Sequence, residues 1–223
     1  MRRVAAVLLV CVVGLCPTAL AQQLKIHDGV PAEIDRRARY VIYLHGRIIE
    51  DQGPRPTHPD WGVYEYRRIL EALAADGATV VAEQRPSMTD MDRFAQHVAD
   101  QVRSLLRTGV AAGRISVIGF SKGGGIAMRT SALLENPHIN FVFLGSCGDG
   151  DFRGLDLRVW GRILSVYEAS DKVGQSCAEL FAKSGSTGTR SEVRINLGEQ
   201  HGAFFRPHNA WLEPVRRWIR EAQ

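Results

Sequence analysis

The stretch Arg114-Ile-Ser-Val-Ile-Gly-Phe-Ser-Lys-Gly-Gly-Gly125 decides the fold of this chain. Its β-branched apolar run, residues 115–118, predicts a buried strand, and the residues from Gly123 onward are typical of a helix start. A strand that turns into a helix without a loop holds the middle residue, Ser121, in a strained backbone conformation. Glycines stand two residues before and after it, because a Cβ there would collide with the neighbouring elements. We therefore expect the Ser121 side chain above the sheet edge, with the Lys122 N–H beside it at a helix N-terminus.

Short apolar runs of strand type alternate with helical patterns along the rest of the chain. Because these runs are apolar on both faces, they predict a mostly parallel central sheet with helices on both faces, an α/β fold. The expected strands, besides the one before Ser121, are Tyr40–Leu44, Ala78–Ala82, Asn140–Leu144, Arg162–Tyr167 and Glu192–Leu197, with a short edge strand or hairpin near Leu24–Ile26.

Apolar residues at helical spacing predict the helices. Ile48–Gly62, rich in proline and glycine, is interpreted as a long loop, and loops of this length in compact domains are usually functional or mobile. The expected helices are Val63–Ala75, Asp92–Thr108, the one after Ser121 to about Glu135, Cys177–Lys183 and Asn209–Glu221.

The N-terminus has the three parts of a secretory signal peptide. Two arginines precede an apolar run of about a dozen residues, and the triplet Ala19-Leu-Ala21 provides a cleavage site. A lipoprotein is less consistent with the sequence, because Cys11 and Cys16 do not follow a small residue. We expect cleavage after Ala21, which lowers the formal net charge from +4 to +2. The expected product is a secreted or periplasmic protein with one domain over residues 22–223.

The composition supports a globular domain with a sizeable core, since 45% of the 223 residues are hydrophobic and 23% are charged. No basic run indicates nucleic-acid binding. The apolar run of the leader is too short to span a bilayer comfortably, so we expect no stable membrane insertion of the mature chain. We expect no cofactor, because neither metal-ligand spacing nor a nucleotide-binding loop is convincing.

Removal of the leader leaves two cysteines, Cys147 and Cys177. A secreted protein meets an oxidising compartment, so we expect a disulfide between them. The alternative is two buried thiols that never meet. A bridge would restrain the loop that follows the strand ending at Tyr167.

Residues with chemically active side chains follow the predicted strands, at the edge where ligands bind in open parallel sheets. A serine hydroxyl is a poor nucleophile unless a base takes its proton and an acid orients that base. His201 follows the last strand on a loop able to reach Ser121, so we expect it to be the base rather than an ordinary loop histidine. Three other histidines are less suitably placed: His97 in a helix, His138 before a strand and His208 beyond the loop.

Asp171 is the expected acid, because it lies four residues after the strand end at Tyr167. Glu168, which is closer to that strand, and Asp149, one strand earlier, remain alternatives. The chain order serine, aspartate, histidine is the order of a known class of hydrolases.

The chain resembles the α/β-hydrolase superfamily over about Tyr40–Trp218, through its Gly-Phe-Ser-Lys-Gly-Gly turn, the early Leu-His-Gly-Arg, Asp171 and the His201-Gly pair. The resemblance implies a backbone oxyanion hole formed by the N–H groups of Arg47, with Ile48 next in line, and of Lys122. The segment between Ser121 and Asp171 is too short for a large lid domain, which favours an open cleft.

These observations predict a secreted serine hydrolase, a carboxylesterase that acts on small or accessible esters through Ser121, His201 and Asp171 and an acyl-enzyme intermediate. The alternatives are an amide or peptide hydrolase, an acyltransferase, or a binding protein with a silent site. Four cations near the predicted site, Arg47, Arg55, Arg85 and Lys122, either attract an anionic substrate or are solvated loop residues.

Overall fold

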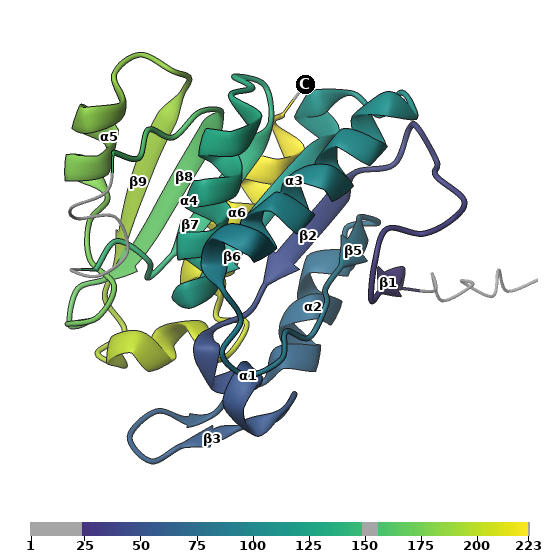
Figure 1. The fold of residues 1–223 in the computed structure, drawn as a ribbon. Helices are drawn as coiled ribbons and strands as arrows, with labels where there is room; N and C mark the ends of the chain where they lie inside the picture. The colour runs from purple at the N-terminus through teal and green to yellow at the C-terminus, as the bar shows by residue number, and fades with distance from the viewer. Residues whose placement is uncertain (1–23, 149–155, 223) are drawn as a thin grey trace, which may run out of the picture.

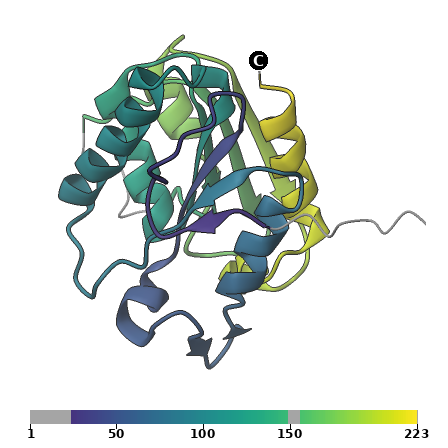
Figure 2. The same ribbon diagram turned by 90° about the vertical axis from the view of Figure 1, so that its right-hand side faces the viewer.

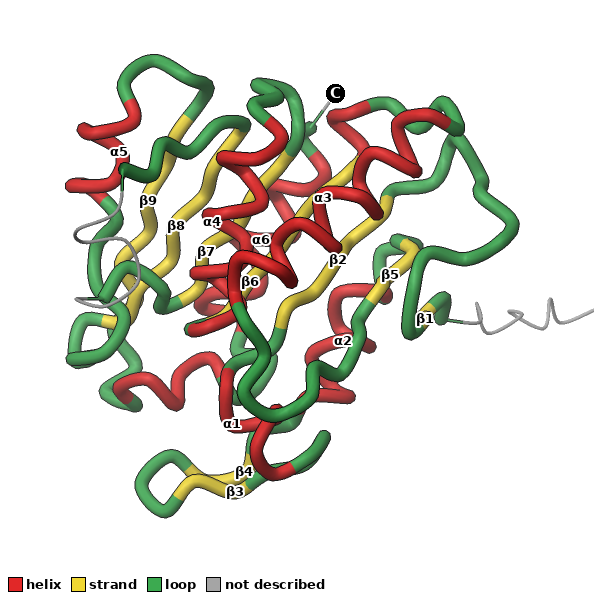
Figure 3. Tube along the Cα trace, viewed as in Figure 1, coloured by secondary structure: helices red, strands yellow, loops and turns green. Residues whose placement is uncertain are grey.

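A computed structural model describes residues 24–148 and 156–222. At its centre is a sheet of seven strands in the order β1-β5-β2-β6-β7-β8-β9, and every neighbouring pair in it is parallel (Figures 1 and 3). The strands are β1 (Ile26–His27), β2 (Tyr40–Leu44), β5 (Thr79–Val81), β6 (Ile115–Phe120), β7 (Asn140–Leu144), β8 (Arg162–Glu168) and β9 (Arg190–Ile195). The predicted parallel α/β sheet is confirmed.

Helices cover both faces of this sheet, as predicted, and each face has its own apolar core (Figures 1 and 2). On one face α3 and α4 pack with α5, and on the other α2 packs with α6. The inner strands are buried along their whole length because both faces are covered. The helices are α2 (Tyr66–Ala74), α3 (Met91–Arg107), α4 (Lys122–Leu134), α5 (Ala178–Ser184) and α6 (Asn209–Arg220), with short 3₁₀ turns η1 (Ala112–Arg114) and η2 (Gln200–Phe204).

The interpretation of Ile48–Gly62 as a loop is wrong in part. The segment holds most of a six-residue helix, α1 (Arg47–Gln52), and a small antiparallel hairpin of β3 (Thr57–His58) and β4 (Gly62–Val63). The helix has fewer than two turns, so it offers too few apolar positions for a periodic pattern. The two-residue strands are likewise shorter than any alternation that a sequence can display. Because Val63 belongs to β4, α2 begins at Tyr66 rather than at Val63.

The position of β6 in the middle of the sheet places Ser121. Gly119 pairs with Leu44 of β2 on one side and with Phe143 of β7 on the other. The chain therefore leaves the sheet at its centre, at the edge where the parallel strands all end. In Figure 1 this is the lower edge, where α1 and the hairpin also lie.

The predicted signal peptide, residues 1–21, and the alternative acid Asp149 lie outside the described residues. Among the helices that are described, none combines the length and the apolar character needed to cross a bilayer. Cys147 and Cys177 are joined by a disulfide, and both are buried.

Candidate active site

Ser121 is the single residue between β6 and α4, since β6 ends at Phe120 and α4 begins at Lys122. Its φ of 53° and ψ of −122° are strained for a residue with a Cβ. A Cβ at Gly119 would collide with the backbone of Gly123, and a Cβ at Gly123 would collide with the carbonyl of Leu44 in β2, so the two glycines allow the helix to lie this close to both strands. The local geometry is that of a nucleophile elbow, as the sequence predicted.

His201 and Asp171 form a buried pair. His201 lies in η2, its Nδ1 is 2.7 Å from Asp171 Oδ2, and the two side chains are 5% and 0% exposed. Asp171 Oδ1 accepts a second hydrogen bond from the Val173 N–H at 2.8 Å. Because an ionised carboxylate only accepts, Nδ1 carries the proton, and Nε2 keeps a lone pair that can accept one. This arrangement suits a general base.

Ser121 and His201 line the same cavity, of about 290 Å³. Among the described residues His201 Nε2 has no hydrogen-bond partner, so the Ser121 hydroxyl shares this cavity without bonding to it. Catalytic hydrogen bonds are often long before substrate binds. The remaining lining combines backbone and apolar side chains with a few polar groups: Gly46, Arg47, Ile48, Asp51, Gln52, His58, Trp61, Phe120, Val173 and Phe205.

Aromatic rings restrain the imidazole of His201 on two sides. The ring centre of Phe120 is 4.8 Å from that of His201, and the ring centre of Trp61 is 5.3 Å away. Trp61 is itself stacked on His58 at 3.8 Å, so the β3–β4 hairpin forms one wall of the cavity. His58 and Trp61 fall in the segment that was interpreted from the sequence as a loop, because the hairpin that presents them was not predicted.

Glu168, the alternative acid nearest to Asp171, has a different role. Its carboxylate accepts hydrogen bonds from the backbone N–H groups of Leu197 at 2.9 Å and Gly198 at 3.2 Å. It therefore ties the end of β8 to the loop that leads to His201. Of the two acids that the structure describes, only Asp171 bonds to the histidine.

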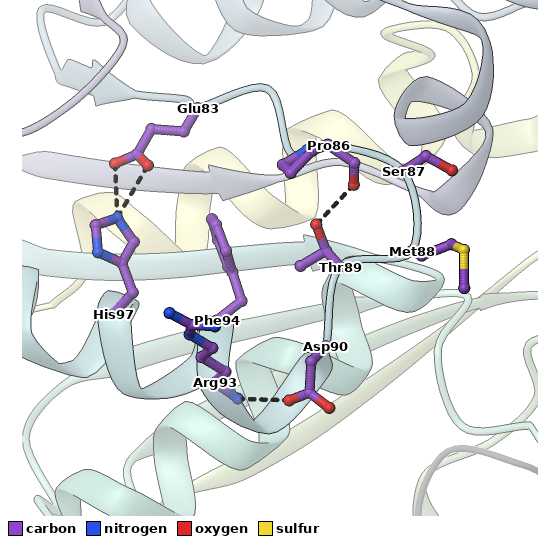
Figure 4. Close-up of a pocket in the computed structure, with 9 residues that line it drawn as sticks. All are labelled: Glu83, Pro86, Ser87, Met88, Thr89, Asp90, Arg93, Phe94 and His97. Atoms are coloured by element: carbon purple, nitrogen blue, oxygen red, sulfur yellow. Dashed lines mark hydrogen bonds and ion pairs between the residues drawn. The ribbon is translucent and has the colours of Figure 1, made fainter.

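Another histidine–carboxylate pair lies in a different cavity. His97 of α3 bonds to Glu83, and Figure 4 shows the two side chains facing each other across one end of that cavity. At about 600 Å³ it is larger than the cavity at Ser121, but none of Ser121, Asp171 and His201 lines it. Its volume alone is no reason to prefer it, because Ser87, the serine in its lining, bonds to Asp51 rather than to a histidine.

The expected oxyanion donors, Arg47 and Lys122, are each the first residue of a helix, α1 and α4 respectively. The N–H of a first helical residue has no partner within its helix, and the helix dipole favours negative charge there. Arg47 lines the cavity that contains Ser121. Both N–H groups thus lie at helix N-termini next to the candidate site.

A buried charge cluster lies behind the two helix starts. Glu50 accepts from Arg85 Nε at 2.8 Å with one oxygen and from Lys122 Nζ at 2.6 Å with the other. Arg85 is 0% exposed in its side chain and pairs with Glu50, so the alternative that it is a solvated loop residue is wrong, and its guanidinium cannot contact a substrate directly. Burial lowers the pKa of Arg85, while the hydrogen bond and the negative charge of Glu50 oppose that shift.

His45 belongs to the same cluster and is neutral. Its Nε2 accepts from the Arg85 backbone N–H at 2.9 Å, so the proton is on Nδ1, which donates to the Gly46 carbonyl at 2.9 Å. Burial and the charge of Arg85 lower the pKa of His45 to about 3. Sequence reasoning missed Glu50, although an acid three residues after Arg47 would lie one helical turn away if that segment were a helix.

In the described part of the chain, no group of three or more histidine, cysteine, aspartate or glutamate side chains could hold a metal ion. No protein-family model matches the chain, and no curated protein matches it by sequence.

Solved structures do match the fold. SOBER1 from Arabidopsis thaliana superposes with a TM-score of 0.55 at 13% identity over 83% of this chain and 99% of that one. A hormone-sensitive lipase from a metagenome library gives a TM-score of 0.58 at 14% identity over 83% of this chain and 78% of that one. DcsB, solved with a substrate analogue, gives 0.58 at 13% identity over 88% and 93%.

Proposed function

Because the chain has the α/β-hydrolase fold, we propose that it is a serine hydrolase, a carboxylesterase acting on small or accessible esters. The similar structures include an esterase/lipase from an uncultured bacterium and the hormone-sensitive lipase, which supports this direction. The observation that carries the proposal is the buried His201–Asp171 pair, whose free Nε2 shares a cavity with Ser121 at a strained strand–helix turn.

In the proposed mechanism Ser121 attacks the ester carbonyl while His201 Nε2 takes its proton. Asp171 holds the imidazole tautomer and stabilises the imidazolium that forms. The N–H groups of Arg47 and Lys122 donate to the oxygen of the tetrahedral intermediate, each contributing about 3 kcal/mol by analogy with measured oxyanion-hole donors. His201 then protonates the leaving alcohol. A water molecule, activated by the same imidazole, releases the acyl group and restores the serine.

The size and lining of the cavity favour a small substrate. At about 290 Å³ it is near the lower limit of ligand pockets, and Trp61, Phe120 and Phe205 make much of its wall apolar. We therefore propose that the substrate carries a short or compact acyl group rather than a long acyl chain.

The decisive experiment compares the leaderless protein with Ser121→Ala on short p-nitrophenyl esters. We expect turnover to fall by about 10⁴- to 10⁶-fold, since the residual rate comes from binding and the oxyanion hole alone. Ser104→Ala is the matched control, because Ser104 lies in α3 and lines neither cavity. A Ser121→Ala protein as active as its parent would sink the proposal.

The alternatives use the same triad and differ in the acceptor or the bond cleaved. A panel of esters, anilides and alcohol or amine acceptors separates an esterase from an amidase and from an acyltransferase. A silent binding protein is distinguished by a fluorophosphonate probe, which should label Ser121 only in a functional triad.

We further propose that the protein is exported and that residues 1–21 are its signal peptide. The disulfide between Cys147 and Cys177 supports an oxidising compartment. N-terminal sequencing of the exported protein is expected to begin at Gln22; a chain that still begins at Met1 contradicts this.

A further inference from the structure

The two proposed oxyanion donors belong to different helices, so something must hold those helix ends together. Arg47 begins α1 after β2, and Lys122 begins α4 after β6. Stabilisation of an oxyanion depends on both N–H groups pointing at one atom, and displacement of about 1 Å can cost roughly 100-fold in rate. The pairing of Leu44 with Gly119 holds together the strand ends that precede the two helices, but the backbone hydrogen bonds within each helix cannot set how the two helix starts lie relative to each other.

Glu50 provides a direct link between them. It lies three residues after Arg47 in α1, and its carboxylate is fully buried. One oxygen binds Lys122 Nζ at 2.6 Å and the other binds Arg85 Nε at 2.8 Å. Lys122 thus contributes its backbone N–H to the site while its side chain holds the helix that carries the other donor.

The link is a buried ion pair rather than a solvated surface pair. The side chains of Glu50 and Arg85 are 0% exposed and that of Lys122 is 17% exposed. Water therefore competes little for these charges, and removing Glu50 would leave the charges of Arg85 and Lys122 there without their partner. The two cations and one carboxylate also leave one net positive charge close to the proposed oxyanion.

His45 adds a second restraint on the first donor. Its Nδ1–H donates to the carbonyl of Gly46, and its ring is held from behind by the Arg85 N–H. The Gly46 carbonyl and the Arg47 N–H belong to one planar peptide group. Fixing the carbonyl on the His45 side therefore fixes the direction of the N–H on the other side.

We propose that Glu50 and Lys122 are positioning residues: their buried ion pair, anchored by Arg85, sets the separation of the N-termini of α1 and α4 and so shapes the oxyanion hole. This inference rests on the proposed function, because it assigns the pair a role in the same reaction. Neither Glu50 nor Lys122 lines the cavity at Ser121.

The test is Lys122→Met, which keeps the backbone N–H of residue 122 and leaves Glu50 paired with Arg85. We expect kcat on a short p-nitrophenyl ester to fall by about 10- to 100-fold with KM changed less than about threefold, since the lost interaction acts in the transition state. The rate of labelling by a fluorophosphonate, which also develops charge on oxygen, falls in parallel. Lys122→Arg, which can reach the same carboxylate, restores much of the rate.

Arg129→Met is the matched control. Arg129 lies in the same helix, is 8% exposed and pairs with Asp92 at 2.8 Å, but it lies two turns along α4 from Lys122. Its loss should lower the melting temperature while kcat of the folded protein stays at the parent value. If Lys122→Met also loses only stability, or if both variants lose kcat equally, the positioning role is wrong.

A second variant tests the pair itself. Glu50→Gln is made in the parent protein and in the Lys122→Met protein. We expect it to lower kcat far less in the Lys122→Met protein, because the ion pair between the two residues is already absent there. Equal losses in both backgrounds overturn the proposal. If the unmodified protein neither hydrolyses esters nor reacts with the phosphonate, the proposed function and this role are both wrong. If the parent is active and Lys122→Met has the same kcat, only the positioning role is wrong.

Discussion

His45 is neutral inside the protein because protonation would place a further positive charge beside Arg85 in a buried site. Burial is the larger cause and the charge of Arg85 the next, and together they lower the pKa of His45 from 6.5 to about 3. Its hydrogen bonds also require the neutral form, since Nε2 accepts from the Arg85 N–H. One imidazole therefore couples the folding of this edge of the sheet to pH.

The sign of that coupling is fixed by the lowered pKa. Above pH 6.5 His45 is neutral in both the folded and the unfolded chain, so the stability it contributes is complete. Between pH 6.5 and 3 the unfolded chain binds the proton and the folded chain does not, which costs up to roughly 1.4 kcal/mol per pH unit. Below about pH 3 the contribution has been lost.

His45→Gln should therefore change how the free energy of unfolding depends on pH. Glutamine keeps an acceptor for the Arg85 N–H but cannot be protonated. We expect the variant to be less stable than the parent at pH 7 and the gap to narrow by about 2–3 kcal/mol at pH 4.5. Urea unfolding at the two pH values measures this, and a gap that does not change with pH would show that His45 titrates alike in both states.

Among single residues, the sequence predicts the roles that depend on neighbouring residues or on position after a strand. Ser121 could be placed because its glycines and flanking strand and helix are contiguous, and the structure has the strained turn that they predicted. Asp171 and His201 were expected from their positions after strands, and the structure brings the two together. Glu50 was not predicted, because its partners Arg85 and Lys122 are 35 and 72 residues away.

Among the elements, those with long patterns were predicted and the short ones were not. The bounds of β7 and the start of α6 agree with prediction because their apolar runs end at clear breaks. The helix α1 and the β3–β4 hairpin are too short for a pattern, and they are held by tertiary contacts. One such contact is the buried Arg85–Glu50 pair. These unpredicted elements supply Arg47 and Trp61 to the candidate site.

The segment between β8 and α5 carries Asp171 and is restrained at two points. The disulfide joins its end, at Cys177, to Cys147 after β7. Between them Gly174 packs so closely on the backbone of Gly145 that a Cβ would collide with it. The neighbouring segments after β7 and β8 thus hold each other and Asp171, the proposed acid.

Removing the disulfide should loosen this segment. Closing a loop of about 30 residues is worth roughly 3–4 kcal/mol in the chain-entropy model. We expect Cys147→Ser/Cys177→Ser to lower the melting temperature by several degrees and kcat by a smaller factor than Ser121→Ala does. Calorimetry and ester hydrolysis, with the reduced parent beside the double variant, measure both. Unchanged values would show that the contact at Gly174 suffices without the bridge.

The candidate site and the contacts between Arg39 and the end of α6 lie at opposite edges of the sheet. The site gathers at the carboxyl ends of the strands, with α1 and the hairpin at the same edge (Figure 1). At the opposite edge Arg39, just before β2, donates to the carbonyls of Ile219, Arg220 and Ala222 at the end of α6. A cation at a helix C-terminus satisfies carbonyls that have no partner within the helix and complements the dipole.

Arg39→Ala should therefore reduce stability without changing catalysis. The loss of these hydrogen bonds is expected to cost about 1–2 kcal/mol of unfolding free energy, discounted for partial exposure. Urea unfolding measures that loss, and kcat on a short ester is compared well below the melting temperature, where both proteins are folded. Arg39→Lys, which keeps the charge but not the fork of donors, should fall between the two in stability. If kcat falls with Arg39→Ala while the protein stays folded, the two edges are coupled, and the residues that shape the site extend through the sheet to its far side.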